Sequence, residues 1–259
     1  MSYQYLIFEE EDGVGMIKIN RPEVRNVLNW DTWMELEHAL KRLHSEPKLR
    51  VGIITGVGEE AFIAGADLNM LKERTPQDAI NASMKANEIL LFMESMEEPM
   101  IAAINGWALG GGCEIALACD IRIASEKAQI GQTEVRVGIM PGYGGNIRLM
   151  RLIGPGRAKE MIFTGKIVNA KEAEGIGLVN RVVPHEKLME EVKRLAKQMA
   201  KGPASIHFAK RSFFQISQHS YLDSLKLDSE IYGDVYKTKD FKEGVMAFLE
   251  KRKPLFKNE

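Results

Sequence analysis

The segment "INGWALGGGCEIALACD", Ile104 to Asp120, strongly limits how this chain can fold. Three consecutive glycines follow a short apolar run, and the helix that they introduce is apolar on every side except at Glu114. Such a helix must be surrounded by protein, because none of its faces suits water. Glycines allow close approach of the main chain, and free N–H groups at a helix start favour negative charge. The segment predicts a buried turn and helix with one carboxyl group inside.

The carboxyl group of Glu114 has two interpretations. A lone buried carboxylate costs several kcal/mol unless it is paired, hydrogen-bonded or protonated. In the structural interpretation the carboxylate either has its hydrogen bonds satisfied inside the protein or reaches solvent past the helix start. In the functional interpretation it is an acid or base of an active site. The functional interpretation is favoured, because perturbed acids concentrate at active sites. The glycine run alone also fits a simple strand-to-helix turn.

A second carboxyl group, Glu134, follows twenty residues later in "GQTEVRVG". Alone it is weak evidence, since a glutamate in a polar loop is usually solvated. Its value lies in the pairing, because the predicted strand "DIRIASE" can carry the chain back beside the helix of Glu114. Two carboxyl groups on either side of one water can divide the roles of acid and base.

A second turn of small residues, "AGADL" from Ala64, also precedes a helical pattern. Asp67 suits the N-cap of that helix. The N–H of Ala66 and one from the glycine run could together polarise a carbonyl group, each contributing a few kcal/mol in a closed site.

The rest of the 259-residue chain alternates β-rich runs with helical patterns, which is typical of an α/β fold. We expect a hairpin over 3–19, an amphipathic helix over 32–46, and a buried strand at "LRVGIITGVG". A helix from Pro76 to Met96 and a strand at "MIAAIN" follow. After His185 the pattern is almost entirely helical, and Gly202-Pro203 is the expected boundary of a C-terminal helical part.

Composition excludes several classes of function. The 35 basic and 36 acidic residues nearly cancel, so no nucleic-acid partner is implied. Cys113 and Cys119 indicate small buried thiols in a reducing compartment, and no apolar run is long enough for a membrane helix. We therefore expect a cytoplasmic protein without a membrane partner. No spacing of histidines predicts a metal, and neither GxSxG nor a Walker motif occurs.

One motif competes with this interpretation. "VGIITGVGEEA" places Gly56, Gly58 and Ala61 in the spacing of a dinucleotide-binding fingerprint. The signal is weak, because Gly65 interrupts the helix that should follow and the motif does not open the fold. Acid–base chemistry on a carbonyl compound remains the favoured hypothesis.

Taken together, the motifs resemble the crotonase, or enoyl-CoA hydratase, superfamily. The matching segments occur in order along essentially the whole chain: "NRPEVRNVLN", "AGADL", "AAINGWALGGGCEIALACDIRIAS", "GQTEVRVGIMPGYGG", "FTGKIVNAKEAEGIGLVNRVVP" and "EGVMAFLEKRKPLFK". The resemblance implies an α/β spiral of ββα units over 1–201. It also implies a helical region over 202–259 that mediates trimers, with hexamers as pairs of trimers.

The resemblance further implies an acyl-CoA thioester as substrate, with no metal and no separate cofactor. The N–H groups of Ala66 and Gly111 would form the oxyanion hole. Glu114 would act as the base toward water and Glu134 would supply the α proton, although swapped or shared roles fit equally well. Further contacts with the substrate or its CoA part are expected from these residues: Ala64, Gly65, Asp67, Leu68, Gly110, Tyr143, and Phe248 and Lys251 of a neighbouring subunit's last helix.

The predicted activity is hydration of a 2-enoyl-CoA to a 3-hydroxyacyl-CoA. The alternatives on the same scaffold are a hydratase of cyclic dienoyl-CoA esters and an enoyl-CoA isomerase, which needs only one carboxyl group. A catalytically silent or RNA-associated member is disfavoured, because both carboxyl groups and both turns are present. Many hydratases have proline at the position of Thr133 and a small residue at that of Tyr143. Further residues considered for the acyl pocket are Met70, Leu71, Met84 and Trp107.

Overall fold

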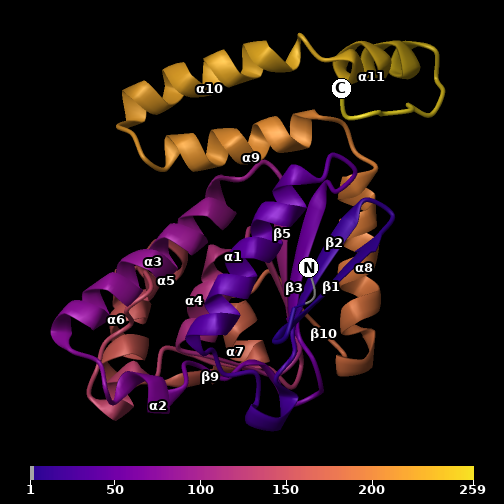
Figure 1. Ribbon diagram of the computed structural model, residues 1–259. Helices are drawn as coiled ribbons and strands as arrows, with labels where there is room; N and C mark the ends of the chain where they lie inside the picture. Colours follow the sequence, from indigo (N-terminus) through magenta and orange to yellow (C-terminus); the bar gives the residue numbers. More distant parts are fainter. Residues whose placement is uncertain (1–2) are drawn as a thin grey trace.

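The computed structural model describes residues 3–259, and a repeated strand–strand–helix unit organises most of them (Figure 1). In the first repeat both strands join the larger sheet, whereas in the next two the first strand joins the larger sheet and the second strand joins the smaller one. The repeats are β1(Leu6–Glu11), β2(Val14–Ile19) and α1(Trp30–Ser45); β3(Val51–Gly56), β4(Ala61–Ile63), α2(Leu68–Leu71) and α3(Pro76–Ser95); β5(Met100–Ile104), β6(Trp107–Leu109) and α4(Gly111–Ala118). The predicted ββα spiral is confirmed.

The remaining body of the protein completes both sheets. It consists of β7(Ile121–Ser125), β8(Gln129–Gly131), the short 3-10 helix η2(Glu134–Val137), α5(Gly145–Ile153), α6(Pro155–Thr164), β9(Ile167–Asn169), α7(Ala170–Gly175), β10(Arg181–Val183) and α8(Leu188–Ala200). The larger sheet has the strand order β1-β2-β3-β5-β7-β10 and the smaller sheet β4-β6-β8-β9. All pairs in the larger sheet are parallel except the β1–β2 hairpin.

The larger sheet is buried on both faces. Side chains alternate along a strand, so Ile53 faces one way and Ile54 the other. Ile53 belongs to the cluster that α8 covers, whereas Ile54 packs in the main core with α1 and α3. The predicted apolar stripe of α1 is fully buried there, including Trp33. Because both faces are covered, the central strands are continuous apolar runs.

The C-terminal helices α9(Ser205–Ile216), α10(Tyr221–Val235) and α11(Lys239–Leu249) lie along one end of the body (Figure 1). The buried Lys210 holds α9 in place: its Nζ donates to the main-chain oxygens of Met93 and Glu98, at 3.1 and 2.8 Å, and lies 2.9 Å from Asp120 Oδ2. Within residues 3–259, no helix is long and apolar enough to cross a membrane.

Candidate active site

Glu114 lies on the first turn of α4 and is 1% exposed, as its apolar neighbours predict. The glycines before it allow α4 to start where it does. Gly110 has φ 50°, and a Cβ on Gly112 would collide with the main-chain oxygen of Ile63 in β4. Any side chain at Gly112 would therefore push α4 away from the smaller sheet. Because the glycines have no side chains, α4 can pack close to the smaller sheet, and this brings the carboxyl group of Glu114 inside the protein.

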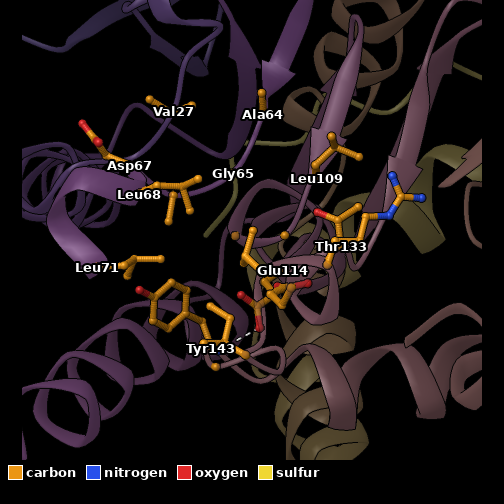
Figure 2. A pocket seen from close by; sticks show the side chains of 18 of the residues that line it. Val27, Ala64, Gly65, Asp67, Leu68, Leu71, Leu109, Glu114, Thr133 and Tyr143 are labelled. Atoms are coloured by element: carbon orange, nitrogen blue, oxygen red, sulfur yellow. Dashed lines mark hydrogen bonds between the residues drawn. The ribbon is translucent and has the colours of Figure 1, made fainter. Parts of the chain in front are cut away.

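Two main-chain N–H groups hold the carboxyl group of Glu114. The amide of Tyr143 donates to Oε1 at 2.7 Å (Figure 2). The amide of Gly145 donates to the same oxygen at 2.9 Å. Burial, and then the charge of Glu134, nevertheless raise the pKa of Glu114 to about 7. The two N–H groups and the positive charge of Arg148 limit that rise, because they stabilise the ionised form.

Glu134 reaches the same site from the smaller sheet. β6 pairs with β8, and the N–H of Gly110 donates to the main-chain oxygen of Gly131 at 2.9 Å. η2 then starts at Glu134, whose Oε1 lies 3.3 Å from where a Cβ on Gly110 would stand. Burial raises the pKa of Glu134 to about 7 as well. Two carboxyl groups with such pKa values hold about one proton between them near neutral pH.

Gln132, which sequence analysis did not single out, is 1% exposed and contacts Glu134. When its amide nitrogen faces Glu134, it donates to Oε1 at 2.9 Å and to Oε2 at 3.2 Å. On the other side its amide group lies close to Gly145, where an added Cβ would come within 2.5 Å of it. Gln132 directly precedes Thr133 and Glu134 in the sequence, but this local pattern does not show whether its side chain is buried or lies in an exposed loop.

A cavity of about 790 Å³ joins the two carboxyl groups to both small-residue turns. The predicted site residues that line it are Ala64, Gly65, Ala66, Asp67, Leu68, Gly110, Gly111, Glu114, Glu134 and Tyr143. Leu71 and Trp107 also line it, whereas Met70 and Met84 do not. Phe248 is 82% exposed on α11, and Lys251 is exposed just beyond that helix. Both therefore lie outside the cavity of their own chain.

Two N–H groups on the cavity wall are suited to donate hydrogen bonds to an oxyanion. In the bridge between Leu28 and Ala66, the N–H of Leu28 donates to Gly65 and the N–H of Asp67 donates to Leu28. This parallel pairing directs the N–H of Ala66 itself away from Leu28. Gly111 is the first residue of α4, so its N–H has no partner in a preceding turn. Asp67 caps α2, as predicted, by accepting from the N–H of Asn69.

The dinucleotide-binding alternative fails at the motif itself. Gly56 ends β3 and Ala61 begins β4, so a strand stands where the fingerprint needs a helix. No helix N-terminus is then available for a pyrophosphate. Within residues 3–259, no group of three or more His, Cys, Asp or Glu side chains is placed to hold a metal ion.

The fold, in which ββα units enclose paired carboxyl groups, is the crotonase fold of acyl-CoA enzymes. The chain belongs to the enoyl-CoA hydratase/isomerase family, whose profile matches residues 9–259. It is 41% identical over 257 residues to a crotonyl-CoA hydratase of Syntrophomonas wolfei, with 99% of each chain covered. It is 41% identical over 254 residues to a short-chain-enoyl-CoA hydratase of Clostridium acetobutylicum, covering 98% of this chain and 97% of that one.

Solved structures agree with this assignment. The crystal structure of an enoyl-CoA hydratase from Bacillus anthracis superposes with a TM-score of 0.94 at 40% identity, covering 99% of this chain and 100% of that chain. One of an enoyl-CoA hydratase from Geobacillus kaustophilus gives a TM-score of 0.96 at 32% identity, covering 100% and 98%. The similarity therefore extends over the C-terminal helices as well as the spiral.

Proposed function

We propose that Glu114 and Glu134 are the acid–base pair with which this enoyl-CoA hydratase adds water across the 2,3 double bond of a 2-enoyl-CoA. The hydro-lyase activity itself follows from the family and from the two full-length relatives. The observation that supports the pair is that two buried carboxyl groups in one cavity both have a pKa raised to about 7. Near neutral pH one of them can be ionised while the other is protonated, as hydration requires.

The thioester oxygen would lie between the N–H groups of Ala66 and Gly111. Attack of water on the β carbon develops negative charge on that oxygen, and the two donors would stabilise it. Glu114 would take a proton from the water and Glu134 would deliver one to the α carbon. Exchanged or shared roles satisfy the same proton balance. The remaining contacts with CoA predicted from the sequence, the independence from a separate cofactor, and the cytoplasmic location stay predictions.

The test follows the loss of enoyl-thioester absorbance with crotonyl-CoA for the wild type, Glu114→Gln and Glu134→Gln. Each substitution keeps the shape of the side chain and removes its proton transfer, so turnover should fall at least about 100-fold. Glu126→Gln is the matched control, because Glu126 is an exposed glutamate on the turn after β7. Near-normal turnover in either active-site variant would refute that residue's role. A wild type that shifts the double bond of a 3-enoyl-CoA but hydrates nothing would favour the isomerase.

We further infer that residues 202–259 assemble the protein into a homotrimer or a pair of trimers, while 1–201 form the enzymatic core. The C-terminal helices expose large apolar side chains, including Tyr221, Leu222 and Phe248, at 77%, 76% and 82%. Exposed apolar surface of this kind marks interaction sites. Phe248 and Lys251 would then be placed against a neighbour's substrate. Sedimentation should give three or six times the mass of one chain, and a monomer would contradict the assembly.

A further inference from the structure

The aromatic ring of Tyr143 lies beside the reacting end of the cavity, and its main chain is fixed on both sides. Its N–H donates to Glu114 at 2.7 Å, and its carbonyl oxygen accepts from Arg148 Nη1 at 2.8 Å. Arg148 is itself held by two hydrogen bonds to the carboxylate of Glu94, at 2.8 and 2.7 Å. The position from which the ring projects is therefore set by the same contacts that hold the catalytic carboxyl group.

The ring extends from that position toward Leu71, the last residue of α2 (Figure 2). Its Cδ2 and Cε2 atoms lie 3.8 Å from where a Cβ on Gly111 would stand. Its hydroxyl oxygen accepts a hydrogen bond from Arg74 Nη1 at 3.3 Å. Behind it, the fully buried Trp33 packs in a T-shaped contact, with ring centroids 5.3 Å apart and an interplanar angle of 76°. The ring thus has a neighbour at each end and a second ring at its back.

This placement decides where an acyl chain can go. With the thioester oxygen at Gly111 and the reacting carbons beside Glu114, the carbons that follow approach the ring of Tyr143. The wall that α3 supplies there consists of the small residues Ala79 and Ser83. Past the hydroxyl lies the guanidinium of Arg74, which an alkyl chain cannot satisfy by hydrogen bonding. The phenol and the guanidinium behind it consequently bound the depth of this part of the cavity.

We propose that Tyr143 limits the length of the acyl chain, so that the site prefers short linear 2-enoyl groups and excludes long ones. This inference rests on the proposed function only for the direction in which the substrate lies. A hydrophobic pocket discriminates by about tenfold or more for each methylene group that it gains or loses. The preference for crotonyl-CoA over 2-octenoyl-CoA should therefore be large.

The experiment measures kcat/KM for crotonyl-, 2-hexenoyl- and 2-octenoyl-CoA with the wild type and variants at Tyr143. For the wild type, kcat/KM should fall at least about tenfold from crotonyl- to 2-octenoyl-CoA. Tyr143→Ala should raise the ratio of 2-octenoyl- to crotonyl-CoA at least about tenfold, and Tyr143→Leu should raise it less. Tyr143→Phe is the matched control, because it keeps the ring and should change the ratio by less than about threefold. A loss of activity that affects all substrates equally cancels in this ratio of kcat/KM values.

Binding of butyryl-CoA and octanoyl-CoA, measured by calorimetry, separates the size of the pocket from the chemistry. If the wild type hydrates no enoyl-CoA but binds butyryl-CoA more tightly than octanoyl-CoA, the proposed function fails and the length limit stands. If the wild type hydrates all three substrates with similar kcat/KM, the limit is wrong while the hydratase assignment stands. An unchanged ratio in the folded Tyr143→Ala and Tyr143→Leu variants would also overturn the proposal, as would a loss of the short-chain preference in Tyr143→Phe.

Discussion

Replacing Glu114 by glutamine is expected to make the protein more stable at alkaline pH while it removes catalysis. The native fold raises the pKa of this carboxyl group from 4.5 to about 7, chiefly by burial. At about 1.4 kcal/mol per pH unit, a rise of the pKa from 4.5 to about 7 corresponds to at most about 3 to 4 kcal/mol of lost stability. Glutamine keeps the oxygen that accepts from Tyr143 and Gly145 but carries no charge.

The pH range of this effect follows from the two pKa values. Below about pH 4.5 the carboxyl group is protonated in both the folded and the unfolded chain, so it costs nothing. Between about 4.5 and 7 the unfolded chain releases the proton while the folded chain keeps it, and stability falls as pH rises. Above about 7 the penalty is complete. The advantage of Glu114→Gln over the wild type should therefore grow across this interval.

The assay is urea denaturation of both proteins at about pH 5 and about pH 8, at equal protein concentrations so that assembly contributes equally. We expect the free energy of unfolding of the variant, relative to the wild type, to be higher by about 2–3 kcal/mol at the alkaline pH than at the acidic pH. Glu126→Gln should show no such dependence. A Glu114→Gln variant whose relative stability is the same at both pH values would refute the argument that burial raises this pKa.

Two further predictions concern the framework of the site. Gly112→Ala should destabilise the protein by about 3 kcal/mol, because the new Cβ would meet the main chain of Ile63. Gly156→Ala lies on α6, where space is open, so it should be neutral or stabilise the protein by up to about 1 kcal/mol. Equal melting temperatures for the two variants would contradict the close approach. Lys210→Met should cost about 3 kcal/mol, because it leaves Asp120 and two main-chain oxygens without their partner. A melting temperature equal to that of the wild type would show that this ion pair does not hold α9.

The larger sheet was readily predicted from the sequence, but the smaller sheet was not. The hairpin of β1 and β2, the helices α1 and α3, and strands such as β5 follow from apolar runs and periodicity, and all are confirmed. The strands of the smaller sheet have three residues each. A run that short shows no alternation, and glycine turns surround it. Pairing between repeats, which lies outside any local window, forms this sheet.

Of the two carboxyl groups in the candidate site, the sequence predicts the burial of only one. Glu114 is surrounded in sequence by apolar residues, so its burial could be predicted. Glu134 has polar neighbours, and only its place beside β8 buries it. The groups that hold the pair come from residues far along the chain: the N–H groups of the 143–145 loop, and Arg148, which bridges that loop to α3. Such contacts depend on tertiary structure and leave no local pattern.

The three glycines before Glu114 each leave room for a different neighbour, which explains why the run contains no side chain. A Cβ at Gly110 would stand 3.3 Å from Oε1 of Glu134. One at Gly111 would press on Leu28 at 3.3 Å and meet the ring of Tyr143 at 3.8 Å. One at Gly112 would collide with β4. The effect of a single alanine would thus depend on its position. At Gly110 it would disturb the second carboxyl group, at Gly111 the proposed donor to the thioester oxygen and the proposed chain-length limit, and at Gly112 the contact between α4 and the smaller sheet. These three effects are separable by measuring the pH–rate profile, the ratio of long- to short-chain turnover, and the melting temperature.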